Sequence, residues 1–383
     1  MFVCNNLEIL TEKAKSVKFI EHLVGKKPLF ILTISNTKVA EVPGITVAGA
    51  EPELVKYTPA ADAELLQYGE CKSISGVPAT PDGKPTPALI TATALRLARI
   101  PYLIVDAGAE IKPRAPYVAL GAEGASENIV LKDAASLRVV ERVFENAESL
   151  GRNIAKTSDY LILGESIPGG TTTALAVLCA LGIDARGKVS SSMPSNPHHI
   201  KTSVANEAMK RLNVNIGDLA DDPFKAVASL GDLMMVAVAG IALGSLGSIP
   251  VLLAGGTQMV AVLGLIRNLT GRSLKRIAIC TTRYVAEDKS ADLKWLVSQT
   301  AKVPLITTDP GLADSKKKGL KAYAEGFVKE GVGAGGSVAA AMLKSKFSIT
   351  KPKILHEIEK NYETLVEKKQ RITDNNAKSY FVS

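Results

Sequence analysis

The sequence lacks the paired cysteines and clustered histidines that mark disulfide-rich proteins and metal sites. Its 383 residues include four cysteines, which lie far apart without a C-x-x-C pair. Cysteines used in this way favour reduced thiols and a cytoplasmic protein. Of the four histidines, His198 and His199 are adjacent, but no carboxylate or cysteine stands at metal-ligand spacing around them. We therefore expect no metal site.

An unbroken apolar run of membrane-spanning length is also missing. The most apolar region, residues 233–266, is divided by glycines and by Pro250 into pieces shorter than the about 20 residues that a membrane helix needs. The N-terminal residues show no basic segment followed by an apolar one, so we expect no signal peptide. The sequence predicts no association with membranes.

The charge pattern disfavours nucleic acid as a partner. The formal net charge is +8 and the pI is about 9.1, but lysine and arginine are scattered, with local clusters only at residues 316–318 and near the C-terminus. Scattered basic residues suit a small anionic ligand better than a nucleic-acid backbone. With 46% hydrophobic and 22% charged residues, the chain is long enough for one large α/β domain or for two domains.

The stretch around which the chain is organised is residues 160–178, which predicts a strand, a glycine-rich loop and a helix. Pro168 ends the strand, and Gly169 and Gly170 allow a sharp turn close to a ligand. Thr171, Thr172 and Thr173 begin the helix, where free N–H groups favour an anion such as phosphate. The loop has neither the Gly-Lys-Ser/Thr ending of a P-loop nor a dinucleotide fingerprint. A phosphate site and a purely structural turn both fit it.

Apolar runs alternate with helical segments along most of the chain. We expect strands at residues 27–34, 101–106, 250–254, 276–281 and 303–308, and helices such as 7–24, 88–99, 136–157, 200–212 and 233–246. We also expect a surface helix or irregular arm at 51–68, a proline-rich loop at 75–87 and a strand ending in the polar loop 188–197. This pattern predicts a doubly wound, Rossmann-like parallel sheet with helices on both faces.

Further candidate site residues follow other strands. In a doubly wound sheet, ligands bind at the carboxyl ends of the strands, which makes Ser35 and Asn36, and the loop Gly255, Gly256 and Thr257, candidate substrate contacts. An ordinary turn is an equally good interpretation of the first pair.

One lysine also stands out as a candidate anion ligand. Lys201 lies in the first turn of its predicted helix, where a positive charge opposes the helix dipole unless an anion binds nearby. A solvated surface lysine is the alternative.

One carboxylate, Glu330, stands beside several glycines that include Gly331 and Gly333. Glycines let other atoms pack around such a group, and burial would raise its pKa into the range of a general base. A glycine-rich connection with an exposed glutamate remains the alternative.

These segments together resemble the nicotinate-nucleotide:dimethylbenzimidazole phosphoribosyltransferase family, and the whole chain resembles its archaeal branch. The family's Gly-Glu-Met-Gly-Ile-Gly-Asn-Thr-Thr loop aligns without a gap with residues 164–172. Its helix with a phosphate-contacting lysine resembles residues 201–209, and its Asp-Pro, Ala-Gly and strand segment resembles residues 222–255. Its Gly-Glu-Gly-Thr-Gly-Ala catalytic segment resembles residues 329–334.

The resemblance implies an enzyme that takes nicotinate mononucleotide and a nitrogenous base, a benzimidazole or a purine. It would release nicotinate and form an α-riboside 5′-phosphate for the lower ligand of a cobamide. Glu330 would be the general base and Glu165 would lie beside the substrates. The backbone from Gly169 to Thr172 and Lys201 would hold the 5′-phosphate, with no metal and no cofactor.

The resemblance also implies a homodimer with a smaller, mainly helical part built from the chain ends. We assign residues 1–25 and 345–383 to this peripheral part, and residues 26–344 to the α/β phosphoribosyltransferase domain.

The sequence departs from the bacterial pattern in two places. Ile167, Pro168 and Gly170 replace Gly, Ile and Asn of the phosphate loop, and no bacterial base-binding segment is recognisable in the first 150 residues. A binding or regulatory protein that keeps the phosphate cradle without transferase activity is therefore the alternative function. A nicotinamide-dependent oxidoreductase is disfavoured, since no Gly-x-Gly-x-x-Gly follows the first strand.

Overall fold

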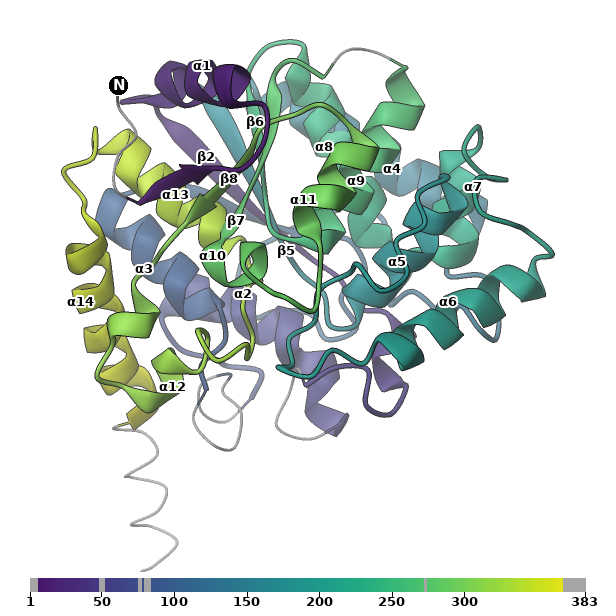
Figure 1. The fold of residues 1–383 in the computed structure, drawn as a ribbon, viewed down its shortest axis with the longest axis horizontal. Coiled ribbons are helices and arrows are strands. Elements are labelled where there is room, and N and C mark those ends of the chain that lie inside the picture. The colour runs from purple at the N-terminus through teal and green to yellow at the C-terminus, as the bar shows by residue number, and fades with distance from the viewer. Residues whose placement is uncertain (1–5, 48–51, 75–77, 79–83, 272–273, 368–383) are drawn as a thin grey trace, which may run out of the picture.

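The chain folds around an eight-stranded sheet (Figure 1) in the order β1-β8-β7-β6-β5-β2-β3-β4. In this computed structural model, residues 6–47, 52–74, 78, 84–271 and 274–367 are described. Every neighbouring pair of strands is parallel except β1 with β8. The strands are β1 (Leu7–Ile9), β2 (Pro28–Ile34), β3 (Tyr102–Asp106), β4 (Val118–Ala119), β5 (Tyr160–Ser166), β6 (Val251–Ala254), β7 (Ile277–Thr282) and β8 (Leu305–Thr308).

The strand order reverses direction between β2 and β5. From β2 the chain builds outward through β3 to β4, and from β5 it builds the other way through β6 and β7 to β8. In a doubly wound sheet, the crevice outside the carboxyl ends of two such strands is the usual ligand site. The predicted doubly wound sheet is confirmed, and its topology places the β5 loop beside this crevice.

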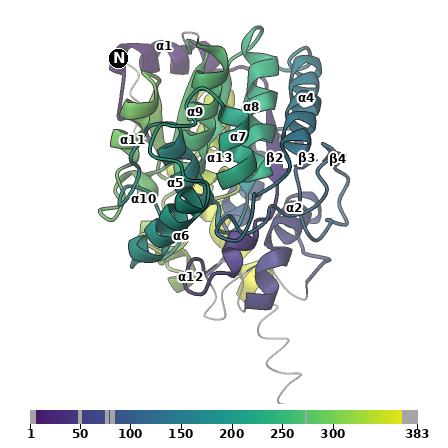
Figure 2. The same cartoon turned by 90° about the vertical axis from the view of Figure 1, so that its right-hand side faces the viewer.

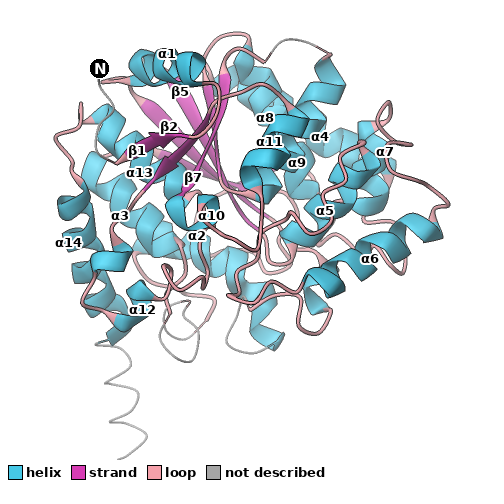
Figure 3. Ribbon diagram, viewed as in Figure 1, coloured by secondary structure: helices cyan, strands magenta, loops and turns pink. Residues whose placement is uncertain are grey.

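Helices cover both faces of the sheet (Figure 3). One layer contains α4, α5, α7, α8, α9 and α11, while α3 and α13 pack on the other face. The helices are α1 (Lys13–Leu23), α2 (Thr58–Tyr68), α3 (Ala88–Ala98), α4 (Leu137–Ile154), α5 (Gly170–Ala180), α6 (His198–Arg211), α7 (Pro223–Leu230), α8 (Leu233–Leu246), α9 (Thr257–Thr270), α10 (Arg283–Ala286), α11 (Leu293–Thr300), α12 (Lys318–Lys321), α13 (Ala334–Lys344) and α14 (Lys351–Tyr362).

The central strands are apolar on both sides because both sides are covered. In β5, Leu161 and Leu163 join the core under α5, α8 and α9, whereas Tyr160 and Ile162 join the core under α3 and α13. Alternate residues of a strand point to opposite faces, so a strand between two helical layers needs a continuous apolar run. That run made these strands recognisable in the sequence.

Two glycines allow α13 to lie directly on the sheet. A Cβ atom on Gly335 would overlap the backbone of Thr281 and Thr282, and one on Gly336 would overlap Ala254. No other residue type permits such an approach. The start of α13, and with it the preceding Glu330, is therefore held against the carboxyl ends of β6 and β7.

Three local expectations were wrong. The helix expected over residues 7–24 begins only at Lys13, because residues 7–9 form the antiparallel edge strand β1. Residues 188–197 contain no strand. The segment expected to be a surface helix or irregular arm does contain a helix, α2, but most of its side chains are buried and do not lie at the surface. A helix that is covered on several sides has no single apolar face, so its sequence shows little amphipathicity.

The two ends of the sheet differ in what covers them. In Figures 1 and 2, α1 lies at the amino end of the strands and α2 lies at the opposite end. Helix α14 packs against α3. That residues 1–25 and 345–383 form a separate peripheral part stays a prediction, although β1 belongs to the sheet.

The cysteines and the apolar helices of the described residues are the subject of two expectations from the sequence. Cys71, Cys179 and Cys280 are thiols there and are not joined by disulfides. None of the helices in the described ranges is both long enough and apolar enough to cross a membrane. The cytoplasmic location stays a prediction.

Candidate active site

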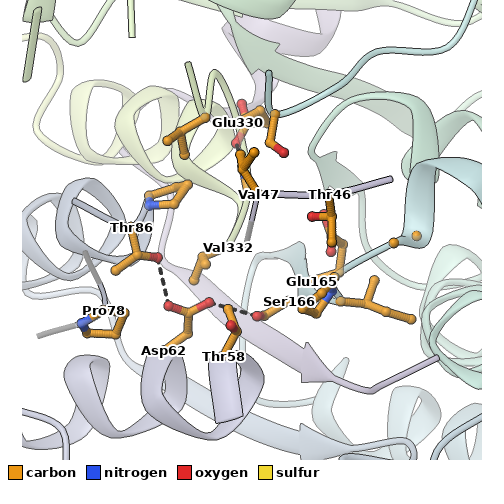
Figure 4. A pocket seen from close by; sticks show the side chains of 18 of the residues that line it. Thr46, Val47, Thr58, Asp62, Pro78, Thr86, Glu165, Ser166, Glu330 and Val332 are labelled. Atoms are coloured by element: carbon orange, nitrogen blue, oxygen red, sulfur yellow. Dashed lines mark hydrogen bonds between the residues drawn. The ribbon is translucent and has the colours of Figure 1, made fainter. Parts of the chain in front are cut away.

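A cavity of about 500 Å³ opens at the carboxyl ends of the strands (Figure 4). Its walls come from α2, from the loops after β5 and β6, from α10 and from the segment before α13. Residues of this wall include Asp62, Thr86, Glu165, Ser166, Ile167, Pro168, Gly169, Gly170, Thr171, Ser190, Ser191, Ser192, Gly256, Gln258, Val328, Lys329, Glu330, Gly331 and Val332. Residues far apart in the sequence thus meet at the topological switch point.

The β5–α5 loop presents a helix start to the cavity. Gly169 has φ of 79° and caps α5, a left-handed conformation that favours glycine. A Cβ atom there would lie 3.0 Å from the backbone nitrogen of Ala40. Gly169, Gly170 and Thr171 line the cavity, so the amino end of α5 and the positive end of its dipole lie at that space. An anion is favoured there.

The end of β7 and the start of α13 hold the carboxylate of Glu330. Its Oε2 accepts hydrogen bonds from the Thr282 N–H (2.7 Å), the Gly335 N–H (3.2 Å) and Thr281 Oγ1 (3.3 Å). The Gly331 N–H donates to Oε1 (3.1 Å). The carboxylate is thus fixed by the end of β7 and by the first turn of α13, where the helix dipole favours negative charge.

Burial raises the pKa of Glu330 to about 7, even though its four hydrogen-bond donors act in the opposite direction. Loss of hydration disfavours the ionised form, while N–H and O–H donors favour it. A carboxylate with this pKa can take a proton at neutral pH.

Two further carboxyl groups line the same cavity. Glu165, in β5, is 4% exposed, and its pKa is raised well above the usual value by burial and by the negative charges of Glu330, Asp232 and Asp62. Asp62, in α2, accepts hydrogen bonds from Ser166 Oγ and Thr86 Oγ1, both at 2.7 Å. Burial raises the pKa of Asp62 to about 6. These influences favour the protonated form of Glu165, which can donate a hydrogen bond.

Two buried lysines lie near the anion-favouring side. The Nζ of Lys201 donates to the carbonyl oxygen of Ser190 (2.6 Å), and Ser190 lines the cavity. Burial first and the charge of Lys329 second lower the pKa of Lys201 to about 7, while the charge of Asp288 acts in the opposite direction. A bound anion would favour the charged form of Lys201.

The cavity wall contains some of the residues that the sequence singled out and omits others. Glu165, Gly169, Gly170, Thr171, Gly256, Glu330 and Gly331 line it. Thr172, Lys201, Gly255, Thr257 and Gly333 lie just behind the wall: Thr257 Oγ1 accepts the Ser190 N–H (3.0 Å), and Gly333 packs on Gly164. The assignment of these five residues as phosphate or substrate ligands stays a prediction.

Ser35 and Asn36 do not line the cavity. Ser35 Oγ donates to the Ala107 carbonyl (2.9 Å), and Asn36 Oδ1 accepts the Glu110 N–H (2.9 Å). Both side chains therefore join the ends of β2 and β3. Their substrate-binding assignment stays a prediction.

Sequence reasoning missed Asp62, Ser166, Gln258 and Lys329 as residues of the cavity wall. Asp62 lies on a helix without a recognisable motif, and no local pattern indicated that it would meet Ser166. For Lys329, its place beside Glu330 was an available signal. The loop expected at 75–87 lies largely outside the described residues, but Pro78 and Lys84 to Pro87 line the cavity.

This arrangement can bind an anion at one wall and remove a proton at another. The start of α5 favours phosphate, Glu330 can act as a base, and protonated Glu165 can donate to a hydroxyl or carbonyl oxygen. Within the described ranges, no group of three or more potential ligands is arranged to hold a metal ion. The absence of a cofactor stays an expectation.

Comparison with known proteins gives consistent similarities. A family model described as Phosphoribosyltransferase matches residues 90–275. A UPF0284 protein of Archaeoglobus fulgidus is 52% identical over 344 residues, covering 90% of this chain and 96% of the relative. Another from Methanopyrus kandleri is 41% identical over 366 residues, covering 96% of each.

A solved structure shares the fold. The nicotinate-nucleotide-dimethylbenzimidazole phosphoribosyltransferase of Thermus thermophilus matches with a TM-score of 0.58 and 18% identity. The match covers 91% of this chain and 92% of that one. At this identity the likeness establishes the architecture.

Proposed function

Because the chain belongs to the phosphoribosyltransferase family, in its branch of archaeal UPF0284 proteins, we propose that it acts on nicotinate mononucleotide. The phosphoribosyl group passes to a benzimidazole or purine base, giving an α-riboside 5′-phosphate and nicotinate. The product serves as precursor of a cobamide lower ligand. The family establishes a transferase, and we propose the identity of its two substrates.

The observation that carries the proposal is the position of Glu330. A carboxylate with a pKa of about 7 lines the same cavity as the anion-favouring start of α5. Phosphoribosyl transfer to a nitrogenous base needs these two elements, one to hold the 5′-phosphate and one to take a proton.

The reaction follows from these positions. A ring nitrogen of the base bonds to C1′ of the ribose, while the bond between C1′ and the pyridinium nitrogen breaks and its electron pair stays with nicotinate. The proton that the base loses goes to the Glu330 carboxylate. The leaving nitrogen starts with a positive charge, so it needs no proton to depart.

The remaining residues orient the substrates. The backbone from Gly169 to Thr172 and the buried Lys201 hold the 5′-phosphate, and Glu165 donates a hydrogen bond beside the ribose. Gly256 and Gly331 give the substrates close access to the backbone, because neither carries a side chain. Positioning of this kind supplies much of the rate in a two-substrate transfer.

The oligomeric state is part of the proposal. By analogy with the family we propose a homodimer, which light scattering coupled to size-exclusion chromatography would test. A monomer of 40.4 kDa would contradict it.

The decisive test measures nicotinate release from nicotinate mononucleotide. 5,6-Dimethylbenzimidazole, adenine and other bases are offered separately, and each product is identified by its mass. Release with one base identifies the acceptor. Tight nucleotide binding without release for any base would favour the alternative, a nucleotide-binding or regulatory protein.

A further inference from the structure

The segment before α13 holds the chain in an unusual backbone conformation. Val328, Lys329 and Val332 have φ angles of 61°, 59° and 53°. These angles lie in the left-handed region, which costs side-chain-bearing residues free energy and costs β-branched residues most. Glu330 is therefore flanked by strained residues on both sides, and such strain persists only where surrounding contacts enforce it.

Two tight turns lead into Glu330. The N–H of Lys329 donates to the Phe327 carbonyl (2.6 Å), and the N–H of Glu330 donates to the Val328 carbonyl (2.7 Å). Each bond closes a three-residue turn, a form that is rare and strained when its central φ is positive. The turns direct the Glu330 side chain toward the end of β7.

Lys329 stands where the bacterial catalytic segment has glycine. In Gly-Glu-Gly-Thr-Gly-Ala, the residue before the glutamate is a glycine, which can adopt a left-handed φ at little cost. In this chain the position carries a long cation that is 2% exposed. The side chain must therefore contribute something that offsets the backbone strain.

The contribution is an ion pair with a residue that follows β7. Lys329 Nζ lies 2.7 Å from Asp288 Oδ2 and donates to the Met193 carbonyl (3.2 Å). Asp288 is held in turn by the N–H and hydroxyl of Ser290, at 2.9 and 2.7 Å. The Asp288 side chain is 8% exposed, so water screens the pair little.

The same region of the chain also holds the residues on either side of the Lys329–Glu330 bond. Thr282 Oγ1 donates to the Lys329 carbonyl (2.6 Å), and the Thr282 N–H donates to Glu330 Oε2 (2.7 Å). Thr282 ends β7 and Asp288 lies six residues further along. The segment 282–288 thus binds the side chain and the carbonyl oxygen of Lys329, and also the carboxylate of Glu330.

We propose that the Lys329–Asp288 ion pair is a positioning device that locks the left-handed turn and so fixes the Glu330 carboxylate on the Thr282 and Gly335 N–H groups. Lys329 acts through Glu330 and not on the substrate. This role rests on the proposed function for its catalytic consequence, but the position of the carboxylate can be measured without turnover.

Carbon-13 NMR titration of labelled glutamate carboxyl groups provides that measurement. Lys329→Gly keeps the backbone favourable and removes the ion pair, and Asp288→Asn removes the charge at the same size. Both variants free the carboxylate from N–H donors that favour its ionised form, so the Glu330 titration midpoint should rise above the wild-type value. The spectrum of Glu330→Gln identifies the resonance.

Other titratable groups near Glu330 do not change in these variants. Glu165 on β5, Cys280 on β7 and Tyr323 interact electrostatically with Glu330. All three remain in both variants. Lys329→Gly removes a positive charge and Asp288→Asn removes a negative one, so their direct electrostatic effects on Glu330 are opposite. A midpoint that rises in both variants therefore reports on the hydrogen bonds of Glu330.

Nicotinate release separates positioning from phosphate contact. We expect Lys329→Gly and Asp288→Asn to lower kcat by about 10- to 100-fold with little change in the KM for nicotinate mononucleotide. The matched control is Lys346→Gly, because Lys346 is exposed, lies after α13 and has a φ of 51°. This control should keep wild-type kinetics.

Several results would overturn the inference. An unchanged Glu330 midpoint in both variants would show that the ion pair does not hold the carboxylate. A higher KM at unchanged kcat would make Lys329 a phosphate ligand instead. If the wild-type protein releases no nicotinate, the proposed function fails, and the NMR titration alone decides the positioning role.

Discussion

The backbone N–H of Thr282 donates a 2.7 Å hydrogen bond to Oε2 of Glu330, 48 residues further along the chain. The last residue of β7 thereby fixes the carboxylate that we propose as general base. Because the donor is backbone, its direction is set by the sheet and does not depend on a rotamer. This contact leads to expectations about activity, pH and stability.

Replacing the proposed base should separate binding from turnover. Glu330→Gln keeps the size of the side chain but cannot take a proton, so we expect nicotinate release to fall by roughly 10²- to 10⁴-fold. Calorimetric titration should show nearly unchanged affinity for nicotinate mononucleotide. Wild-type turnover in this variant would exclude Glu330 as the base.

The rate should depend on pH through the same group. Glu330 must be ionised to act as a base, and burial raises its pKa to about 7. We therefore expect kcat to rise with pH and level off above about 7. Measuring kcat with 5,6-dimethylbenzimidazole from pH 5 to 9 tests this expectation. A kcat that stays constant over this whole range, as for a group with a pKa near 4.5, would contradict it.

The raised pKa of Glu330 should also affect the free energy of unfolding. A group whose folded pKa is raised from 4.5 to about 7 favours folding below pH 4.5, and this contribution is lost as pH rises through 7. Relative to wild type, Glu330→Gln should therefore gain stability between pH 4.5 and 8, on the order of 3 kcal/mol. Urea unfolding of both proteins at several pH values measures the difference. A constant difference would mean that the folded pKa is not raised.

Glu165 should tolerate replacement by the neutral glutamine. Its pKa is raised well above the usual value, by burial first and then by nearby carboxylates, and this favours its protonated form. Glu165→Gln keeps a neutral hydrogen-bonding group, and we expect less than about a tenfold loss of kcat. Glu165→Ala removes that group and should lose more. Equal losses in Glu165→Gln and Glu330→Gln would show that Glu165 acts in its ionised form.

Gly169 should be sensitive to a single added methyl group. Gly169→Ala places a side chain at a φ of 79° and 3.0 Å from Ala40, whereas Gly187 has a φ of 68° with open space around it. We expect Gly187→Ala to cost about 1 kcal/mol of unfolding free energy. Gly169→Ala should cost more and also weaken nucleotide binding. Denaturant unfolding and calorimetry measure both, and equal behaviour of the two variants would remove Gly169 from the site.

Local sequence patterns were sufficient for most of the architecture. A strand between two helical layers must be apolar on both faces, so runs such as residues 160–163 and 250–254 could be recognised. The glycine-rich turn at residues 168–170 and the glycines around Glu330 were also visible, because backbone turns and close approaches require glycine. These patterns are local, and they determined the doubly wound fold and the position of the cavity loops.

Contacts between distant residues were decided only by the tertiary structure. Asp62 meets Ser166 across 104 residues and Lys329 meets Asp288 across 41, and neither pair leaves a periodic trace in the sequence. The edge strand β1 is likewise defined by its antiparallel pairing with β8 and not by its three residues. Hydrophobic periodicity determines which face of an element is buried, but the partner of each buried polar group depends on how the layers pack. The sequence thus determined the sheet and its loops, while packing determined which carboxylates share one cavity.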